Sequence, residues 1–288
     1  MTFSTNATAD ATASRSRHLV QPGGVASAGC GTAWDDWFTG TRHAEIWLSL
    51  AWYDVLLRYR RSLLGPVWLT LSMGALIMGM GPLYATLFNV QLSQFFPHLT
   101  LGIIFWSYLA GVVGEGCSTF ISAASYLKQA PYSRSVFSWR IIARHTIYLL
   151  HHLVLFIPVA AWARVTPSPN ILLILPAVAI VLINVHALTL TLGFLSARFR
   201  DVPQIVSSAL QLAMFLTPVF WLPDALPTRA RFVLYNPFAA WLELLRAPLL
   251  GHAPAWIHWQ TAAIISVINV AIAILMYQRC RHRVVYWV

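Results

Sequence analysis

The chain has 288 residues, of which 58% are hydrophobic and 10% are charged, and its formal net charge is +10. About a quarter of the residues of a typical soluble domain are charged, so this composition excludes an ordinary soluble protein. The positive residues flank apolar stretches and do not form one patch, which favours orientation in a membrane over nucleic-acid binding. The three cysteines lie far apart without metal-ligand spacing, so we expect neither a disulfide framework nor a zinc site.

The N-terminal residues 1–33 are rich in Ala, Thr, Ser and Gly, a composition typical of a disordered tail. The letters SAGC, which end at Cys30, resemble a bacterial lipoprotein processing site. No apolar stretch of the length found in signal peptides precedes them, and we therefore reject that interpretation.

Residues 34–65 are expected to form cytoplasmic interface helices. In the stretch AEIWLSLAWYDVLLRYRRS, which starts at Ala44, the apolar side chains fall on one helical face, and Glu45, Ser49 and Arg60 lie across from them. Tryptophans on one side and arginines at the end predict a helix that lies in the membrane interface. The alternative is a helix that binds a soluble partner.

Apolar stretches of roughly 20 residues, the length of a helix that crosses a bilayer, recur along the rest of the chain. The sequence therefore predicts an all-α integral membrane protein, with a transmembrane domain over residues 66–288 that contains six transmembrane helices. The predicted spans cover residues 66–88, 99–121, 141–163, 171–195, 205–222 and 256–277.

The distribution of Lys and Arg predicts the orientation of these spans. With the N-terminus inside, fifteen of the 19 basic residues are cytoplasmic, and both termini are cytoplasmic. The four that fall outside are Arg164, Arg229, Arg231 and Arg246.

The segment 222–256 is too long for a simple turn and too apolar for a solvated loop. Pro237 and Pro248 bracket a run that is long enough for a short helix but not for a span, and Gly251 follows. We expect short re-entrant helices that dip into the outer leaflet and return, since broken backbone at that depth needs shielding by protein or a water-filled cavity.

Two spans carry polar groups that need an explanation. Glu115 is the one acidic residue inside a predicted span, and intramembrane acids are costly and usually functional. In the fifth predicted span, Gln204, Ser207, Ser208 and Gln211 form a polar stripe at helical spacing, which suits a helix that faces a sugar path or a partner helix. Pro218 is expected to break that helix before the outer surface.

No catalytic motif is present in the sequence. The adjacent His151 and His152 point about 100° apart on a helix and cannot share one metal, so we interpret them as packing groups or as the lining of an aqueous path. A phosphate-binding loop needs glycines before a lysine, and the sole lysine, Lys128, has none close before it. This chain is therefore expected not to bind ATP through such a loop. If ATP drives transport, another polypeptide would hydrolyse the ATP.

Three blocks in order, DVLLRYRRSLLGPVWLTL, ARFRDVPQIVSSALQLAMFLTPVFW and YNPFAAWLELLRAPLLG, resemble the permease subunit of ABC-type polysaccharide exporters. The resemblance runs from about Trp34 to the C-terminus. It implies a homodimer in the bacterial inner membrane and two copies of a separate ATPase subunit that binds ATP and magnesium. The implied substrate is a polyprenyl-pyrophosphate-linked glycan of the O-antigen, capsule or teichoic-acid type. The loop LKQAPYSRSVFSWR matches the family less closely.

Within this framework the sequence predicts three groups of site residues. The lipid-linked pyrophosphate headgroup would meet Arg58, Arg60 and Arg61. The translocation path would include Tyr84, Phe88, Trp106, Tyr108, Glu115, Gln211, Phe215 and Phe220, because aromatic faces contact sugar rings without fixing one register. The ATPase would contact Tyr126, Lys128, Tyr132, Arg134 and Phe137. Two alternatives stay open: an ABC exporter permease for a non-glycan lipid or drug, and a membrane-embedded transferase acting on lipid-linked sugars.

Overall fold

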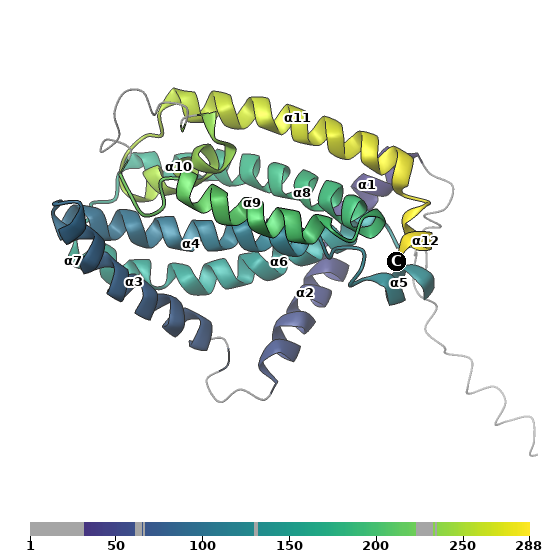
Figure 1. Ribbon diagram of the computed structural model, residues 1–288, viewed down its shortest axis with the longest axis horizontal. Coiled ribbons are helices and arrows are strands. Elements are labelled where there is room, and N and C mark those ends of the chain that lie inside the picture. Colours follow the sequence, from purple (N-terminus) through teal and green to yellow (C-terminus); the bar gives the residue numbers. More distant parts are fainter. Residues whose placement is uncertain (1–31, 61–64, 66, 130–131, 223–232, 234) are drawn as a thin grey trace, which may run out of the picture.

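The computed structural model describes residues 32–60, 65, 67–129, 132–222, 233 and 235–288, and every regular element in these ranges is a helix (Figure 1). The helices are α1 (Ala33–Arg42), α2 (Ala44–Tyr59), α3 (Val67–Leu87), α4 (Leu92–Gly116), α5 (Ala124–Gln129), α6 (Arg134–Leu153), α7 (Phe156–Trp162), the 3₁₀ helix η1 (Pro169–Leu173), α8 (Ile174–Arg198), α9 (Val202–Leu216), α10 (Pro237–Leu249), α11 (Trp256–Cys280) and α12 (Val284–Trp287). The predicted N-terminal tail lies almost entirely outside the described residues.

Among the described residues, five of the six predicted spans are present as helices long and apolar enough to cross a membrane. They cover Val67–Leu87, Leu92–Gly116, Arg134–Trp162, Pro169–Arg198 and Trp256–Cys280. The second begins seven residues before the predicted start, because Pro97 and His98 lie within α4 and do not mark its boundary. An all-helical, multi-pass membrane fold is thus confirmed.

The remaining predicted span, 205–222, contains the shorter helix α9, which has 15 residues. At 1.5 Å per residue this helix is about 22 Å long, less than the roughly 30 Å hydrocarbon core of a bilayer. The helix ends because Thr217 adopts an extended conformation before Pro218, as residues that precede a proline tend to do. The count of six spans is therefore not confirmed.

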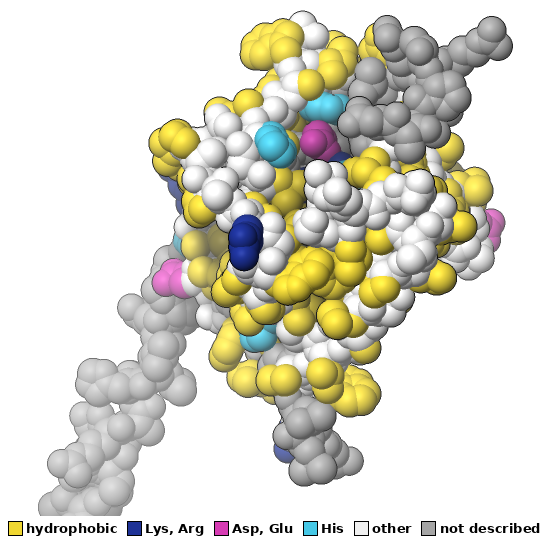
Figure 2. All heavy atoms as spheres, turned by 90° about the vertical axis from the view of Figure 1, so that its left-hand side faces the viewer, with side chains coloured by type: hydrophobic (Ala, Val, Ile, Leu, Met, Phe, Trp, Pro, Cys, Tyr) yellow, Lys and Arg dark blue, Asp and Glu magenta, His cyan; other side chains and the backbone are white. Residues whose placement is uncertain are grey.

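The long helices α4, α6, α8 and α11 run roughly side by side in Figure 1, and α2 crosses them at an angle. We call the end with α1, α5 and α12 the basic end, because Lys128, Arg134 and the arginines after α11 lie there, and we call the opposite end, with α7 and α10, the far end. Figure 2 views the far end, where hydrophobic and uncharged side chains predominate. Charged side chains are thus sparse at the far end.

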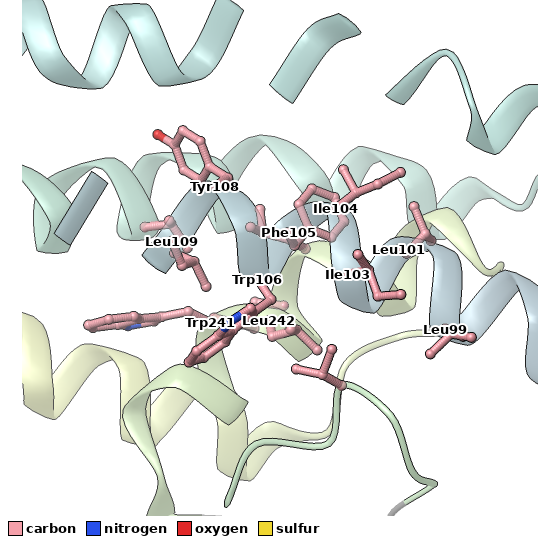
Figure 3. Close-up of a cluster of buried hydrophobic side chains, with 14 of the residues drawn as sticks. Leu99, Leu101, Ile103, Ile104, Phe105, Trp106, Tyr108, Leu109, Trp241 and Leu242 are labelled. Atoms are coloured by element: carbon pink, nitrogen blue, oxygen red, sulfur yellow. The ribbon is translucent and has the colours of Figure 1, made fainter. Parts of the chain in front are cut away.

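Helix α4 is the core of the bundle. In its most apolar stretch, 83% of the residues are buried, whereas at most 33% are buried in the corresponding stretch of each of the other four spans. Helices α3, α6, α8, α9 and α10 all pack against it. Figure 3 shows part of the resulting apolar cluster, with Trp106 of α4 beside Trp241 and Leu242 of α10.

Helices α8 and α11 are joined by hydrogen bonds between polar side chains. Asn184 Nδ2 donates to Ser266 Oγ at 2.6 Å, and Asn269 Nδ2 donates to Asn184 Oδ1 at 2.9 Å. In an apolar surrounding such contacts fix which faces of two helices meet.

At the far end, α10 is held by a buried arginine. Arg246 is 1% exposed, and its Nη1 donates to Pro218 O at 2.8 Å and lies 2.9 Å from His98 Nε2. Arg246 also forms an ion pair with Glu243 on the same helix. Because a guanidinium only donates, His98 Nε2 accepts here. This side chain therefore ties α4 and α10 to the turn that follows α9.

The Arg246→Ala substitution should lower the free energy of unfolding by about 2–4 kcal/mol, since it opens a cavity and leaves Pro218 O without its donor. Denaturant titration of the purified protein in mild detergent measures the change. The exposed Arg200→Ala variant at the basic end is the control and should change stability by less than about 0.5 kcal/mol. Equal stability of both variants would show that the contacts of Arg246 do not stabilise the fold.

Candidate functional site

Helix α1 is docked onto the basic end of the bundle by side-chain hydrogen bonds. Tyr277 on α11 donates to Asp36 Oδ2 at 2.7 Å, and Ser135 donates to the carbonyl oxygen of Trp37 at 2.9 Å. Trp139 Nε1 on α6 donates to Thr41 Oγ1 at 3.1 Å. These contacts fix the point from which α2 starts.

Helix α2 is anchored to α6 by the mostly buried carboxylate of Asp54. Arg140 binds Asp54 through two parallel hydrogen bonds of 2.7 and 2.6 Å, and Arg144 Nη1 donates to the same carboxylate at 2.9 Å. All three side chains are at most 19% exposed. Two-pronged arginine–carboxylate contacts are geometrically specific, so they set the position of α2 on the bundle.

Glu115 extends this network to α4. Its carboxylate pairs with Arg144, lies 3.0 Å from His145 Nε2, and lies 4.0 Å from Nη2 of Arg58 on α2. The His145 contact is within ion-pair distance and becomes an ion pair when the imidazole is protonated. We define the arginine cluster as Asp54, Arg58, Glu115, Arg140, Arg144 and His145.

Arg58 is the most accessible cation of the cluster, with a side chain that is 51% exposed. Its Nη1 donates to Tyr148 Oη at 3.2 Å, and its guanidinium lies 5.4 Å from the centre of that ring. Partial burial lowers the pKa of Arg58, but the neighbouring Tyr148 and Glu115 outweigh this effect and raise it above its usual range. Arg58 is therefore always charged, and this part of the surface attracts anions.

Of the other predicted headgroup residues, Arg60 is exposed just after the end of α2. Arg61 lies outside the described residues. The structure thus places Arg58 and Arg60 at one end of α2, where Arg58 adjoins the cluster.

A second feature is a groove between α4 and α9 with a volume of about 420 Å³. Its lining consists of Trp106, Ala110, Gly114, Pro203, Ser207, Leu210, Gln211 and Met214. We call it the α4–α9 groove. It presents an aromatic ring on one wall and a hydroxyl and an amide on the other, a combination that suits a ligand with both apolar faces and polar edges.

The predicted path residues divide among several surfaces. Trp106 and Gln211 line the α4–α9 groove, whereas Tyr108 points to the opposite side of α4 in Figure 3 and lines an apolar pocket bounded by α6 and α8. Phe215 is 67% exposed on α9. The structure therefore does not bring Tyr108 together with Trp106.

Three further aromatic residues predicted for the path meet towards the far end. Tyr84 stacks on Phe220 with ring centres 5.9 Å apart and contacts Phe88 at 5.8 Å. Glu115 belongs to the arginine cluster and is not in the lining of the groove.

The predicted ATPase-contact residues lie at the basic end. Lys128 is exposed on α5, and Tyr126 and Tyr132 are half-buried. Arg134 donates to the carbonyl oxygens of Arg281 and Tyr132, at 3.0 and 3.1 Å. Phe137 is 2% exposed beneath Tyr126 and Tyr132, so it supports these rings and is not available for a direct contact.

Sequence reasoning missed Asp54, Arg140, Arg144 and His145 as members of a site. A signal existed, since Arg140 and Arg144 stand four residues apart on one helical face at the edge of a predicted span, and charges at such depth need partners. Within the described ranges, no group of three or more His, Cys, Asp or Glu side chains could hold a metal ion.

Comparison with known proteins gives a consistent group of relatives. Residues 45–250 match the family described as ABC-2 type transporter. Two proteins of Klebsiella pneumoniae named O-antigen export system permease protein RfbA are 23% and 24% identical to this chain over 225 aligned residues. Each match covers 76% of this chain and 87% of the relative. A Myxococcus xanthus protein of the same name is 24% identical over 212 aligned residues, and the match covers 71% of this chain and 80% of that protein.

The Asp54→Asn substitution should release α2 from the bundle, because it leaves two mostly buried guanidinium groups without their shared carboxylate. Loss of one partner of a buried pair costs roughly 3 kcal/mol, so amide hydrogen exchange in α2 should become about 100-fold faster. Hydrogen exchange with mass spectrometry measures this.

The matched control is Glu45→Gln on the exposed side of the same helix, which should leave α2 protected. Unchanged exchange after Asp54→Asn would mean that α2 is held by apolar contacts alone.

Proposed function

The chain belongs to the ABC-2 type transporter family, and from this premise we propose that it is the membrane-spanning subunit of an ATP-driven exporter of a bacterial polysaccharide. The observation that carries the proposal is the match to O-antigen export permeases over most of both chains. The chain is a transporter permease with several membrane spans, not an enzyme, and the family implies an ATPase partner.

ATP and magnesium belong on that partner, in two copies. The absence of a phosphate-binding loop from the sequence supports this division of labour. With the positive-inside rule, the basic end faces the cytoplasm of a bacterial inner membrane, and both termini lie on that side.

The functional unit is a homodimer in which α9 faces the second copy or a shared aqueous path. None of the residues of α9 is buried within one chain. Its exposed side chains include the polar Gln204, Ser207, Ser208 and Gln211, and also Ile205, Leu212 and Phe215. Polar groups that face lipid are costly, so protein or water must cover them.

The substrate is a polyprenyl-pyrophosphate-linked glycan, whose headgroup is received by Arg58, Arg60 and Arg61 at the cytoplasmic interface. The accessible Arg58 next to the arginine cluster supports this assignment, since guanidinium groups bind phosphate oxygens in a two-pronged geometry. The α4–α9 groove, with Trp106 opposite Ser207 and Gln211, supports passage of a sugar chain.

Reconstitution with its ATPase subunit should show that this chain moves such a glycan across proteoliposomes only when ATP is hydrolysed, while the chain alone hydrolyses none. The Arg58→Lys variant should insert normally but export about tenfold more slowly, a loss of roughly 1.4 kcal/mol, because lysine lacks the planar fork. Arg200→Lys, also exposed, is the control. Transport of a drug or phospholipid in place of the glycan would contradict the proposal.

Cysteine crosslinking should place the ATPase at the basic end. After replacement of the native cysteines, Lys128→Cys on α5 should capture the ATPase, and Thr166→Cys, exposed in the 163–170 loop at the far end, should not. The reason is that the basic end carries the cytoplasmic arginines. Capture through Thr166→Cys alone would make both the orientation and the contact wrong.

A further inference from the structure

The carboxylate of Glu115 lies among two arginines and a histidine from two other helices. Arg144 pairs with it, His145 Nε2 lies 3.0 Å away on α6, and Arg58 Nη2 lies 4.0 Å away on α2. Glu115 lies in the last turn of α4, where the negative end of the helix dipole disfavours an acid. Helix stability therefore does not explain why an acid is present here, whereas the surrounding cations do.

Glu115 does not satisfy the groups around it. The cluster contains three guanidinium groups and two carboxylates, and Asp54 is already bound by both Arg140 and Arg144. Arg144 Nε is buried without a hydrogen-bond partner among the described residues, and Arg58 Nη2 lies 4.0 Å from Glu115 Oε1, beyond hydrogen-bond distance. One carboxylate with two oxygens thus leaves donors unused and positive charge in excess.

A phosphate or pyrophosphate fits these unused donors better than a carboxylate does. It offers at least three acceptor oxygens and more negative charge, and arginine forks bind it with matched geometry. Access is available, because the side chains of Arg58 and Glu115 are 51% and 33% exposed. Because Glu115 is partly exposed, its carboxylate can rotate towards water and be solvated when a ligand displaces it.

We propose that Glu115 is an internal competitor that occupies a phosphate site formed by Arg58, Arg144 and His145. This proposal rests on the proposed function, because it takes the pyrophosphate headgroup of the carried lipid as the ligand. It adds Arg144 and His145 to the headgroup site and gives Glu115 a role. The headgroup displaces the Glu115 carboxylate. When no headgroup is bound, the carboxylate occupies the site and excludes weaker anions.

The test is equilibrium binding of farnesyl pyrophosphate and of inorganic pyrophosphate to the full chain in phosphatidylcholine nanodiscs. Glu115→Gln keeps the shape of the side chain and removes its charge, so both ligands should bind at least tenfold more tightly than to the parent. Glu45→Gln makes the same change of charge on α2 outside the cluster and should alter the Kd less than twofold. Adding Arg144→Gln to Glu115→Gln should abolish the gain.

A second variant separates competition from general electrostatics and guards against misfolding of the first. Glu115→Asp keeps the charge but shortens the side chain by one methylene, which draws the carboxylate back from Arg58. Competition predicts roughly threefold tighter binding, whereas a purely electrostatic effect predicts no change. Unchanged or weaker binding in both Glu115 variants overturns the proposal, and so does an equal gain in Glu45→Gln.

The two ligands and a parallel export assay distinguish the remaining outcomes. A Glu115-dependent gain for inorganic pyrophosphate without any binding of farnesyl pyrophosphate would overturn the assignment to a lipid headgroup. Glycan export by the parent, together with no effect of Glu115 on binding, would overturn this inference alone. A clear Glu115 effect without export by the parent would overturn the proposed function and retain the anion site.

Discussion

One guanidinium, that of Arg144, joins three helices at the basic end of the bundle. It binds Asp54 on α2 and Glu115 on α4 while it projects from α6. An arginine suits this position because its planar fork reaches two carboxylates at once and never loses its charge. The position of α2 on the bundle, the exposure of Arg58 and the crowding of arginines around Glu115 all depend on this side chain.

The same constraint connects the two halves of the proposed mechanism. Helix α2 carries Arg58, the first cation that an arriving headgroup would meet, and α4 carries Glu115 at its end and Trp106 on the groove. A change at the cluster therefore affects both α2 and α4, the helix against which α3, α6 and α8 pack.

The fold was predictable where the deciding information is local. Runs of apolar residues long enough to cross a bilayer predict the spans, and the Thr217–Pro218 step predicts the end of α9. The site was only partly predictable. Glu115 and Arg58 stand out by type and position, but Asp54 and Arg140 are 86 residues apart in sequence, and their pairing follows from how α2 crosses α6. Likewise, Tyr108 and Trp106 are both aromatic and close in sequence, yet their separation by two positions sends them to opposite sides of α4.

The buried Arg246 also has a consequence for how the chain is built. In the proposed orientation this charge must cross the membrane during synthesis, and a lone arginine at the centre of a bilayer costs roughly 2.5–3.5 kcal/mol on insertion scales. Glu243 travels with it as a counter-ion, and His98 was made 148 residues earlier on α4. The acceptor is thus already in place when α10 emerges, so the direction of translation itself orders the assembly of the far end.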